Sequence, residues 1–259
     1  GGKRVALIGH GTIGGTCVNV GCVPSKTMIR AAEALHGAQS AHRFPGLHGE
    51  AHVADWAAHV TAKDDLVSTL RKKKYADLLP AYEDVTYIDE GHARLVPGGV
   101  EVAGRKFTAP RVIVATGGRP AVPDIPGIQD APTLDSTSLL KLEQLPDSLI
   151  FLGGGYIGVE LAQAHRRLGS AVTILQKGSI LPKDDPELVT VVRERLRAEG
   201  IDVRENVAVA EVARSSATGP AGDVQAGVRV VLGGAEVITG SHLLVAAGRR
   251  AVVAGLGLD

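Results

Sequence analysis

The chain has 259 residues, of which 44% are hydrophobic and 22% charged, a length that suits one large domain or two modest ones. Its 28 Lys and Arg balance its 28 Asp and Glu, which removes the electrostatic argument for a nucleic-acid or acidic-membrane partner. An aromatic content of 3% argues against a stacking surface for single-stranded nucleic acid. The sequence shows neither a membrane span nor a signal peptide, so we expect a cytoplasmic protein that acts on small molecules.

Continuous apolar runs predict buried strands of a parallel sheet, because a strand covered on both faces does not alternate with polar residues. In chain order, the runs are residues 5–8, 112–115, 149–152, 172–175 and 243–247. Between the third and fourth runs, apolar residues recur at helical spacing over residues 159–168. Strands that alternate with helices predict an α/β fold with a doubly wound sheet.

Three other segments have recognisable patterns. Residues 51–76 predict a long helix, with the basic residues 71–74 near its C-terminal end, where they complement the helix dipole. Residues 85–108 carry short alternating segments around a Pro-Gly-Gly turn, which predicts a small antiparallel meander. Four prolines between residues 120 and 132 indicate an extended connector, so we place a domain boundary near residue 145.

Both cysteines, Cys17 and Cys22, lie in one short segment. A regular helix would separate their Cα atoms by about 7.5 Å, beyond the ~4.4–6.8 Å that a disulfide tolerates, so we expect Asn19 and Gly21 to distort the backbone. The spacing leaves three interpretations open: a redox-active dithiol, half of a metal site, or two unrelated thiols. Zinc sites usually use spacers of two to four residues and need further ligands, which the scattered histidines do not supply, so the pattern favours the dithiol.

A glycine-rich motif follows the apolar run at 149–152 and opens the helical pattern. Gly153 would permit a tight turn, Gly155 would let a pyrophosphate approach the backbone, and Gly158 would allow the helix to pack closely on the strand. The phosphates would lie at the N-terminus of the helix. Because a second strand follows at 172–175, the context favours a dinucleotide site over a glycine-rich turn without a ligand.

The second strand of this unit is followed by Gln176 and Lys177, where an acidic residue would bind the ribose 2′-hydroxyl of NAD. No carboxylate is there to repel a 2′-phosphate, and Lys177 can pair with one. The sequence therefore predicts NADPH as the preferred nucleotide.

The cysteine segment, the glycine motif, Thr116-Gly117-Gly118 and Ala247-Gly248-Arg249 occur in the order typical of flavin-dependent pyridine nucleotide–disulfide oxidoreductases. The chain resembles this family over nearly its whole length. The resemblance implies a two-domain FAD/NAD(P)-binding Rossmann-like architecture with a small antiparallel meander. It also implies that electrons pass from NADPH to FAD and on to the dithiol.

The resemblance gives roles to individual residues. Cys22 would face the flavin as the charge-transfer thiol, and Cys17 would be the interchange thiol. Lys26 would pair with Glu160 near the flavin, and Tyr156 would cover the nicotinamide pocket. The implied FAD contacts are Gly14, Gly15, Thr16, Lys26, Ala93, Thr116, Gly117 and Gly118. The implied NADPH contacts are Gly153, Gly155, Tyr156, Ile157, Gly158, Glu160, Gln176, Lys177 and Gly248.

Within the family, residues 24–32 and 125–127 are most similar to mercuric reductases, and dihydrolipoyl dehydrogenases are the near competitor. The implied chemistry is mercury detoxification: Hg(II), a soft cation captured by Cys17 and Cys22, is reduced to Hg(0). The alternatives are dihydrolipoyl dehydrogenase or another disulfide reductase, a nucleotide-binding fragment without activity, and a dithiol that binds Hg(II) without reducing it.

The resemblance has two gaps. Residues 9–14 match the glycine pattern by letter, but Cys17 follows at once, so most of one βαβ unit is missing and the match is a coincidence of that junction. The chain also stops before the interface domain through which the family forms homodimers. We therefore expect a partial chain: a truncated FAD-binding domain with the dithiol over 1–144, an NAD(P)H-binding domain over 145–250, and the start of a return to the FAD domain over 251–259.

Overall fold

The structure is a computed structural model that describes residues 2–218 and 224–258. Gly1 and Asp259, the two ends of the predicted domain division, lie outside the described residues. The chain forms two compact units. Unit 1 comprises Gly1–Pro24, Asp64–Arg119 and Arg250–Asp259, and unit 2 comprises Ser25–Lys63 and Pro120–Arg249.

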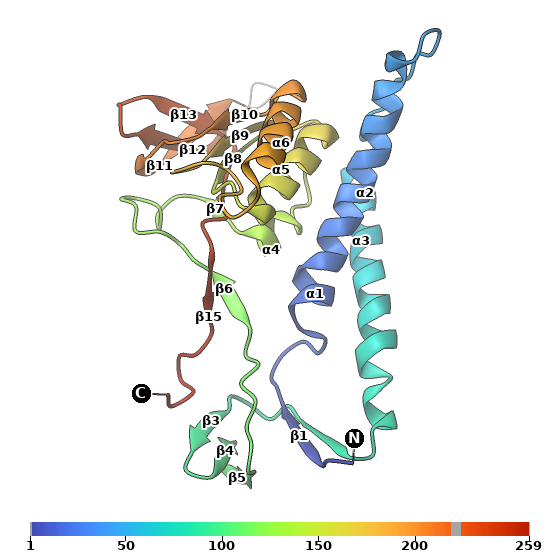
Figure 1. Ribbon diagram of the computed structural model, residues 1–259, viewed down its shortest axis with the longest axis vertical. Coiled ribbons are helices and arrows are strands. Elements are labelled where there is room, and N and C mark those ends of the chain that lie inside the picture. The colour runs from blue at the N-terminus through green and yellow to red at the C-terminus, as the bar shows by residue number, and fades with distance from the viewer. Residues whose placement is uncertain (1, 219–223, 259) are drawn as a thin grey trace. The chain divides into compact units, whose positions relative to one another are not determined.

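Unit 2 is built on a five-stranded parallel sheet with the strand order β10-β9-β8-β14-β7 (Figure 1). The strands are β7 (Thr133–Leu134), β8 (Ser148–Leu152), β9 (Ala171–Leu175), β10 (Asp202–Arg204) and β14 (His242–Val245). From β8 the chain runs outward through β9 to β10, and it returns on the other side of β8 as β14. The strand order therefore reverses between β8 and β14, and such a switch point is where open α/β sheets bind ligands.

A layer of structure covers each face of this sheet. The helices of one layer are α4 (Ser136–Leu139), α5 (Tyr156–Leu168) and α6 (Pro186–Ala198). The other layer is an antiparallel sheet of β11 (Val209–Thr218), β12 (Val224–Leu232) and β13 (Val237–Gly240). Leu149 and Phe151 of β8 belong to the core with the helices, and Ile150 belongs to the core with the antiparallel sheet. Because β8 is buried on both faces, its sequence is a continuous apolar run.

Unit 2 also includes parts of two long helices, α2 (Cys22–Gln39), which continues into the 3₁₀ turn η1 (Ser40–Arg43), and α3 (Trp56–Arg71). Met28 of α2 and Trp56 of α3 are buried in the same core as α5, and the Trp56 indole nitrogen donates a hydrogen bond to the Leu142 carbonyl at 2.8 Å. Because of this packing, the boundaries between the compact units follow Pro24, Lys63, Arg119 and Arg249, and none lies at residue 145. The predicted domain division stays a prediction.

Unit 1 contains two small sheets. In the first, β1 (Val5–Ile8) pairs in parallel with β2 (Val85–Ile88). The second is an antiparallel meander of β3 (Arg94–Val96), β4 (Gly99–Val102) and β5 (Arg105–Thr108). The helical elements that lie wholly in unit 1 are α1 (Gly15–Val20), the π-helical turn η2 (Lys72–Ala76) and the 3₁₀ turn η3 (Leu79–Ala81). Strands β6 (Gly118–Pro120) and β15 (Arg249–Ala251) pair with each other where the chain passes from one unit to the other.

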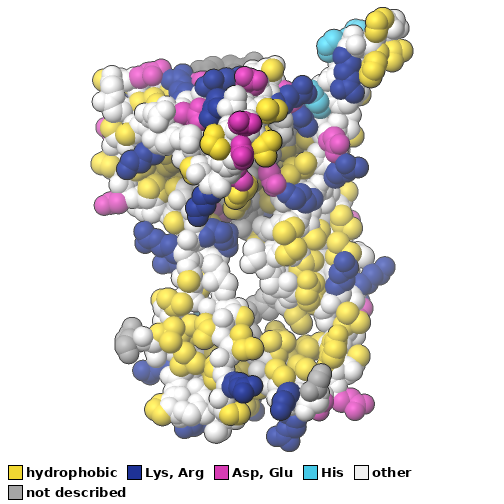
Figure 2. Space-filling model, in the orientation of Figure 1, with side chains coloured by type: hydrophobic (Ala, Val, Ile, Leu, Met, Phe, Trp, Pro, Cys, Tyr) yellow, Lys and Arg dark blue, Asp and Glu magenta, His cyan; other side chains and the backbone are white. Residues whose placement is uncertain are grey.

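Four of the five predicted strands are confirmed, as β1, β8, β9 and β14. The prediction for residues 112–115 is wrong, since they form no strand and Ile113 is 89% exposed. The prediction that β1 is buried is also wrong: Val5 and Leu7 are 46% and 43% exposed. A parallel strand is buried only where neighbouring strands and helices cover it. β1 has one such neighbour and residues 112–115 have none, and Figure 2 shows hydrophobic side chains gathered at the surface over β1 and the meander.

The other segment predictions are confirmed with shifted bounds. The long helix begins at Trp56 rather than at residue 51, and its basic residues fall in the last residue of α3 and in η2. The meander around Pro97 and Gly98 is confirmed as β3–β5. Within the described residues, no helix is long and apolar enough to cross a membrane.

Candidate functional site

The turn between β8 and α5 leaves no room for side chains where the backbone doubles back. Gly153 has a φ of +118°, and a Cβ atom there would lie 2.4 Å from the Ala246 carbonyl oxygen. A Cβ atom on Gly158 would lie 2.0 Å from the Gly153 carbonyl oxygen, so α5 packs this closely on β8 only because residue 158 is glycine. At Gly155 the space is open, with nothing within 4 Å of the Cβ position. These three glycines fit a pyrophosphate at the N-terminus of α5.

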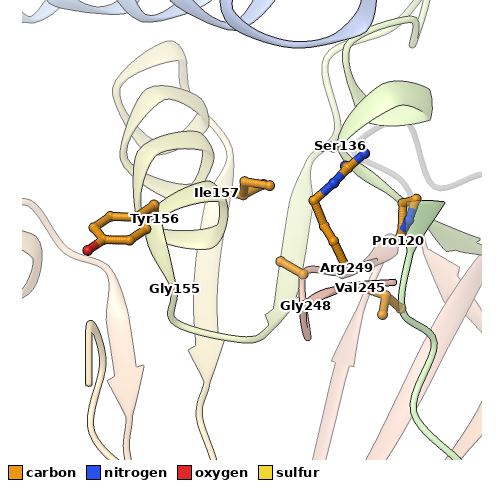
Figure 3. A pocket seen from close by; sticks show the side chains of 9 residues that line it. Pro120, Ser136, Gly155, Tyr156, Ile157, Val245, Gly248 and Arg249 are labelled. Carbon is orange, nitrogen blue, oxygen red and sulfur yellow. The ribbon is translucent and has the colours of Figure 1, made fainter. Parts of the chain in front are cut away.

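A cavity of about 170 Å³ lies at the carboxyl ends of β8 and β14, at the switch point of the sheet (Figure 3). Gly155 and Ile157 line it from the first turn of α5, and Gly248 lines it from the segment after β14. In Figure 3 the Arg249 side chain reaches toward Ser136, at the start of α4. The cavity therefore adjoins the glycine turn of the nucleotide site, and all of its lining residues belong to unit 2.

Tyr156 begins α5, and its ring lies on the opposite side of this turn from Ile157 (Figure 3). The ring is 61% exposed, and its hydroxyl donates a hydrogen bond to Asp184 Oδ1 at 2.9 Å. That hydrogen bond raises the pKa of Tyr156. Tyr156 is thus held by Asp184, a contact that no local sequence pattern predicts because Asp184 lies 28 residues further along the chain, in the segment between β9 and α6.

Gln176 and Lys177 stand directly after β9, as the sequence predicts for the ribose end of the nucleotide. The Gln176 side-chain oxygen accepts a hydrogen bond from the Gly154 backbone nitrogen at 2.8 Å, so Gln176 fixes the glycine turn. Lys177 is exposed and makes no ion pair among the residues that the structure describes. Lys177 thus places a cation directly after β9, which favours a 2′-phosphate on the adenosine ribose.

The helix carrying the cysteines is broken between them. Cys17 lies in α1, α1 ends at Val20, and α2 begins at Cys22. A Cβ atom on Gly21 would lie 2.9 Å from the Thr16 carbonyl oxygen, so the break requires glycine. Both thiols are exposed, and the Cys17 thiol is within hydrogen-bonding contact of Cys22. The expected distortion is confirmed at Gly21, where it brings the two thiols together, but not at Asn19, which lies within the helix α1.

Asn19 ties this short helix to its surroundings. Its side-chain nitrogen donates hydrogen bonds to the Ile13 and Gly15 carbonyls at 3.0 and 2.9 Å, and its oxygen accepts one from Arg71 at 3.2 Å. Hydrogen bonding to Cys22 raises the pKa of Cys17, with a smaller opposing effect from the charge of Lys74. Arg71 lies 52 residues from Asn19 in the chain, so no local pattern predicts this contact.

Lys26 and Glu160 form an ion pair in unit 2, with the Lys26 Nζ atom 2.6 Å from Glu160 Oε2. Lys26 lies on the first turns of α2 and Glu160 on α5. The structure thus brings together two residues 134 positions apart that the resemblance had paired. Both side chains are about half exposed, so the pair contributes little to stability, and its role toward a flavin stays a prediction.

The implied FAD contacts in unit 1 are backbone turns and exposed side chains. Gly14, which precedes α1, and Gly15, its first residue, have positive φ values. Thr16 in α1 is exposed, and half-buried Ala93 precedes β3. The Thr116 hydroxyl donates a hydrogen bond to the Val252 carbonyl at 2.6 Å. The Val252 nitrogen donates one to the Gly117 carbonyl at 3.0 Å, and Gly118 begins β6. These contacts hold the loop at 116–118 against the segment that follows β15.

The described residues of unit 1 do not form a complete cradle for FAD. A dinucleotide unit needs a strand, a glycine turn, a full helix and a second parallel strand. After β1 the chain enters the six-residue α1 and breaks at Gly21, and the parallel partner of β1 comes only after α3. The structure therefore fits NADPH in unit 2 but only one edge of a flavin site in unit 1.

Comparison with known proteins agrees with this geometry. The sequence profile of the pyridine nucleotide-disulphide oxidoreductases matches residues 1–258. A mercuric reductase from Streptomyces lividans is 41% identical and one from Lysinibacillus sphaericus is 40% identical, each over the whole of this chain but only 54% and 46% of their own lengths. The chain thus spans about half the length of the curated relatives it matches.

Solved structures give the same result. The Cu(II) complex of the HOCl-induced flavoprotein disulfide reductase RclA from Escherichia coli superposes with a TM-score of 0.81 and 32% identity, over 99% of this chain and 53% of that protein. A structure of the same reductase described without copper also matches, with a TM-score of 0.81. FAD and NADPH are the cofactors of this group of oxidoreductases. The chain belongs to the pyridine nucleotide-disulphide oxidoreductase family, of which it is a partial member.

Proposed function

We propose that the chain is the NADPH-binding, dithiol-bearing part of an oxidoreductase that reduces Hg(II) to Hg(0). The observation that carries this proposal is the contact between Cys17 and Cys22 across the helix break at Gly21. Two exposed thiols held together by a glycine-dependent break can both bind one soft cation as thiolates. The mercuric reductases among the relatives support mercury as that cation.

The overall reaction balances as a two-electron transfer. NADPH gives up a hydride, Hg(II) takes two electrons to become Hg(0), and NADP⁺ and a proton are the other products. In the family, bound FAD carries the electrons between the nicotinamide and the dithiol. Because unit 1 supplies only one edge of a flavin site, FAD retention is the property on which activity depends.

The chain's own residues do the binding and positioning. The glycines of the turn before α5 receive the pyrophosphate of NADPH, and Lys177 pairs with its 2′-phosphate. Lys26 and Glu160 hold each other at 2.6 Å. Cys17 and Cys22 hold the metal ion. Homodimer formation and a cytoplasmic location stay predictions from the sequence.

The test is the flavin content of the purified chain, followed by mercury-dependent NADPH oxidation. Visible absorbance with and without added FAD gives the flavin stoichiometry. If FAD is retained, we expect NADPH oxidation that depends on Hg(II) and is abolished in the Cys17→Ser/Cys22→Ser variant, while NADPH affinity in that variant is unchanged. Hg(II)-dependent oxidation that survives in the variant would refute the role of the thiols.

Two further results would redirect the proposal. A chain that binds NADPH and Hg(II) but retains no FAD would be a nucleotide-binding module with a mercury-binding dithiol, as the incomplete flavin site of unit 1 suggests. A disulfide reductase is the second enzymatic candidate, favoured by the 32% identity to a flavoprotein disulfide reductase. Faster NADPH oxidation with lipoamide or glutathione disulfide than with Hg(II) would select it.

A further inference from the structure

A second cavity, of about 510 Å³, lies in unit 2 at the C-terminal end of α5. It is open to solvent between the end of α2 with η1, the end of α5, and α6. Since α5 has 13 residues and is about 20 Å long, this cavity is remote from the glycine turn at the helix N-terminus. The charged and titratable residues of its lining that matter here are His36, Arg43, Arg166, Arg167, Arg195 and Glu199.

Positive charge exceeds negative charge in this lining. Glu199 is the one carboxylate among these residues, and with four guanidinium groups against it their formal charges sum to +3. The carboxylate of Glu33, outside the lining, also acts on Arg167. Arg167 binds Glu199 through two hydrogen bonds of 2.7 Å, and Arg195 binds it through one of 2.5 Å. Burial raises the pKa of Glu199, but the hydrogen bonds from Arg167 and Arg195 outweigh it and hold the value at about 2. Glu199 is therefore ionised and fixes two of the arginines in place.

The other two arginines have no carboxylate partner among the described residues. Arg166 donates to the backbone carbonyls of Glu199 and Ser170, at 2.9 and 3.5 Å. Arg43 lies over the Phe44 ring, with its guanidinium carbon 5.0 Å from the ring centre. The planar guanidinium fork is the side chain best suited to phosphate and carboxylate oxygens, and these two forks keep donors to spare.

The pKa of His36 is also affected by the positive charges around it. Arg195 donates a hydrogen bond to its Nε2 atom at 2.9 Å, which requires that this nitrogen carry no proton, and the Ser40 hydroxyl lies 3.3 Å from the same atom. Burial lowers the pKa of His36, the charges of Arg167, Arg195 and Arg43 lower it further, and Glu199 alone opposes them. An anion placed among the arginines would oppose them as well.

We propose that this cavity binds a small anion with two or more negative charges, of the phosphate or polycarboxylate class. The cavity has the volume of a small-molecule site. Arg167 and Arg195 are held in place by Glu199, and Arg166 by backbone carbonyls, before any ligand arrives, which lowers the cost of ordering them on binding. The proposal is independent of the redox function, because none of these residues belongs to the nucleotide turn or to the dithiol.

The test is calorimetric titration of the whole chain with inorganic phosphate, inorganic pyrophosphate and citrate, which separates the phosphate from the polycarboxylate source. In the Arg43→Gln/Arg195→Gln variant, Glu199 still pairs with Arg167. This variant should bind the preferred anion at least ~10-fold more weakly than the unaltered chain does. The matched control is Arg214→Gln/Arg229→Gln, which removes the same charge from β11 and β12. That control should bind as the unaltered chain does.

A second readout uses the unaltered chain. With the anion bound, the titration midpoint of His36 in an NMR pH series should rise. Absence of binding up to about 10 mM, equal weakening in both double variants, or a His36 midpoint that does not respond would overturn the proposal. Binding of an Asp/Glu-rich peptide without binding of any small anion would overturn it too, in favour of a protein partner.

Discussion

Unit 2 and unit 1 have parallel strands of similar sequence but very different surroundings. In unit 2, β8 lies between two other strands and between two layers, and Phe151 and Ile150 are 0% and 2% exposed. In unit 1, β1 has one strand partner, and Val5 and Leu7 are almost half exposed. An apolar run therefore predicts a strand but not its burial, which depends on what the rest of the chain places around it.

Hydrogen exchange gives the largest expected contrast between the units. Amides of β8, β9 and β14 should be protected by a factor of ~100 or more beyond those of β1 and β2, because local opening costs little where few apolar contacts cover a strand. The measurement is exchange of the unaltered chain followed by mass spectrometry of peptides. Equal protection in β1 and β8 would show that unit 1 is as stably packed as unit 2.

Gly158→Ala should break the nucleotide turn of unit 2. The added Cβ would lie 2.0 Å from the Gly153 carbonyl oxygen, so α5 must move away from β8. We expect a loss of about 3 kcal/mol in the free energy of unfolding, measured by urea denaturation, and loss of NADPH binding. Gly234→Ala is the matched control, because nothing lies within 4 Å of its Cβ position. An unchanged NADPH affinity in Gly158→Ala would contradict the assigned site.

The core of unit 2 should respond to acid through His165. This side chain is fully buried on α5, its Nε2 atom has no hydrogen-bond partner, and burial lowers its pKa to about 4. Because that value lies below the ordinary 6.5, the unfolded chain binds more protons, so stability is full above pH 6.5 and is lost as pH falls toward 4. Between pH 7.5 and 5.0 the loss should be about 2 kcal/mol.

Urea denaturation at those two pH values tests this prediction. Between these two pH values, the free energy of unfolding of the His165→Leu variant should fall by about 2 kcal/mol less than that of the unaltered chain. His48→Gln, which alters an exposed histidine, should show the full pH dependence. Equal slopes for the unaltered chain and His165→Leu would remove His165 as the acid-sensitive group.

The smallest expected effect concerns nucleotide preference. Lys177→Glu places a carboxylate where we expect the 2′-phosphate, so NADPH affinity should fall about 10-fold relative to NADH affinity. Fluorescence titration with the two nucleotides measures the ratio. Lys106→Glu, the same charge change on β5 of unit 1, should leave it unaltered. If the ratio of NADPH to NADH affinity is the same in Lys177→Glu and in the unaltered chain, Lys177 does not bind the 2′-phosphate.

The elements predicted correctly from the sequence are those whose signal is local. The unit β8–α5–β9 combines two continuous apolar strands, a glycine turn and a helix of period 3.6 within 28 residues, from Ser148 to Leu175. The antiparallel sheet β11–β13 was missed, although the Gly233-Gly234 dipeptide between β12 and β13 is a turn signal. The contacts of Asp184 with Tyr156 and of Arg71 with Asn19 were missed because they join residues far apart in the chain.

The sequence by itself determined the family, the strand–turn–helix of the nucleotide site and the glycine between the cysteines, since each depends on residue types at fixed short spacing. Tertiary structure alone decided which apolar runs are buried, how α2 and α3 divide between the two units, and that four arginines and Glu199 line one cavity. These features depend on the packing of segments more than 100 residues apart. The physical reason is that burial and electrostatic potential are set by every neighbour of a residue, whereas backbone conformation is set mainly by the nearest ones.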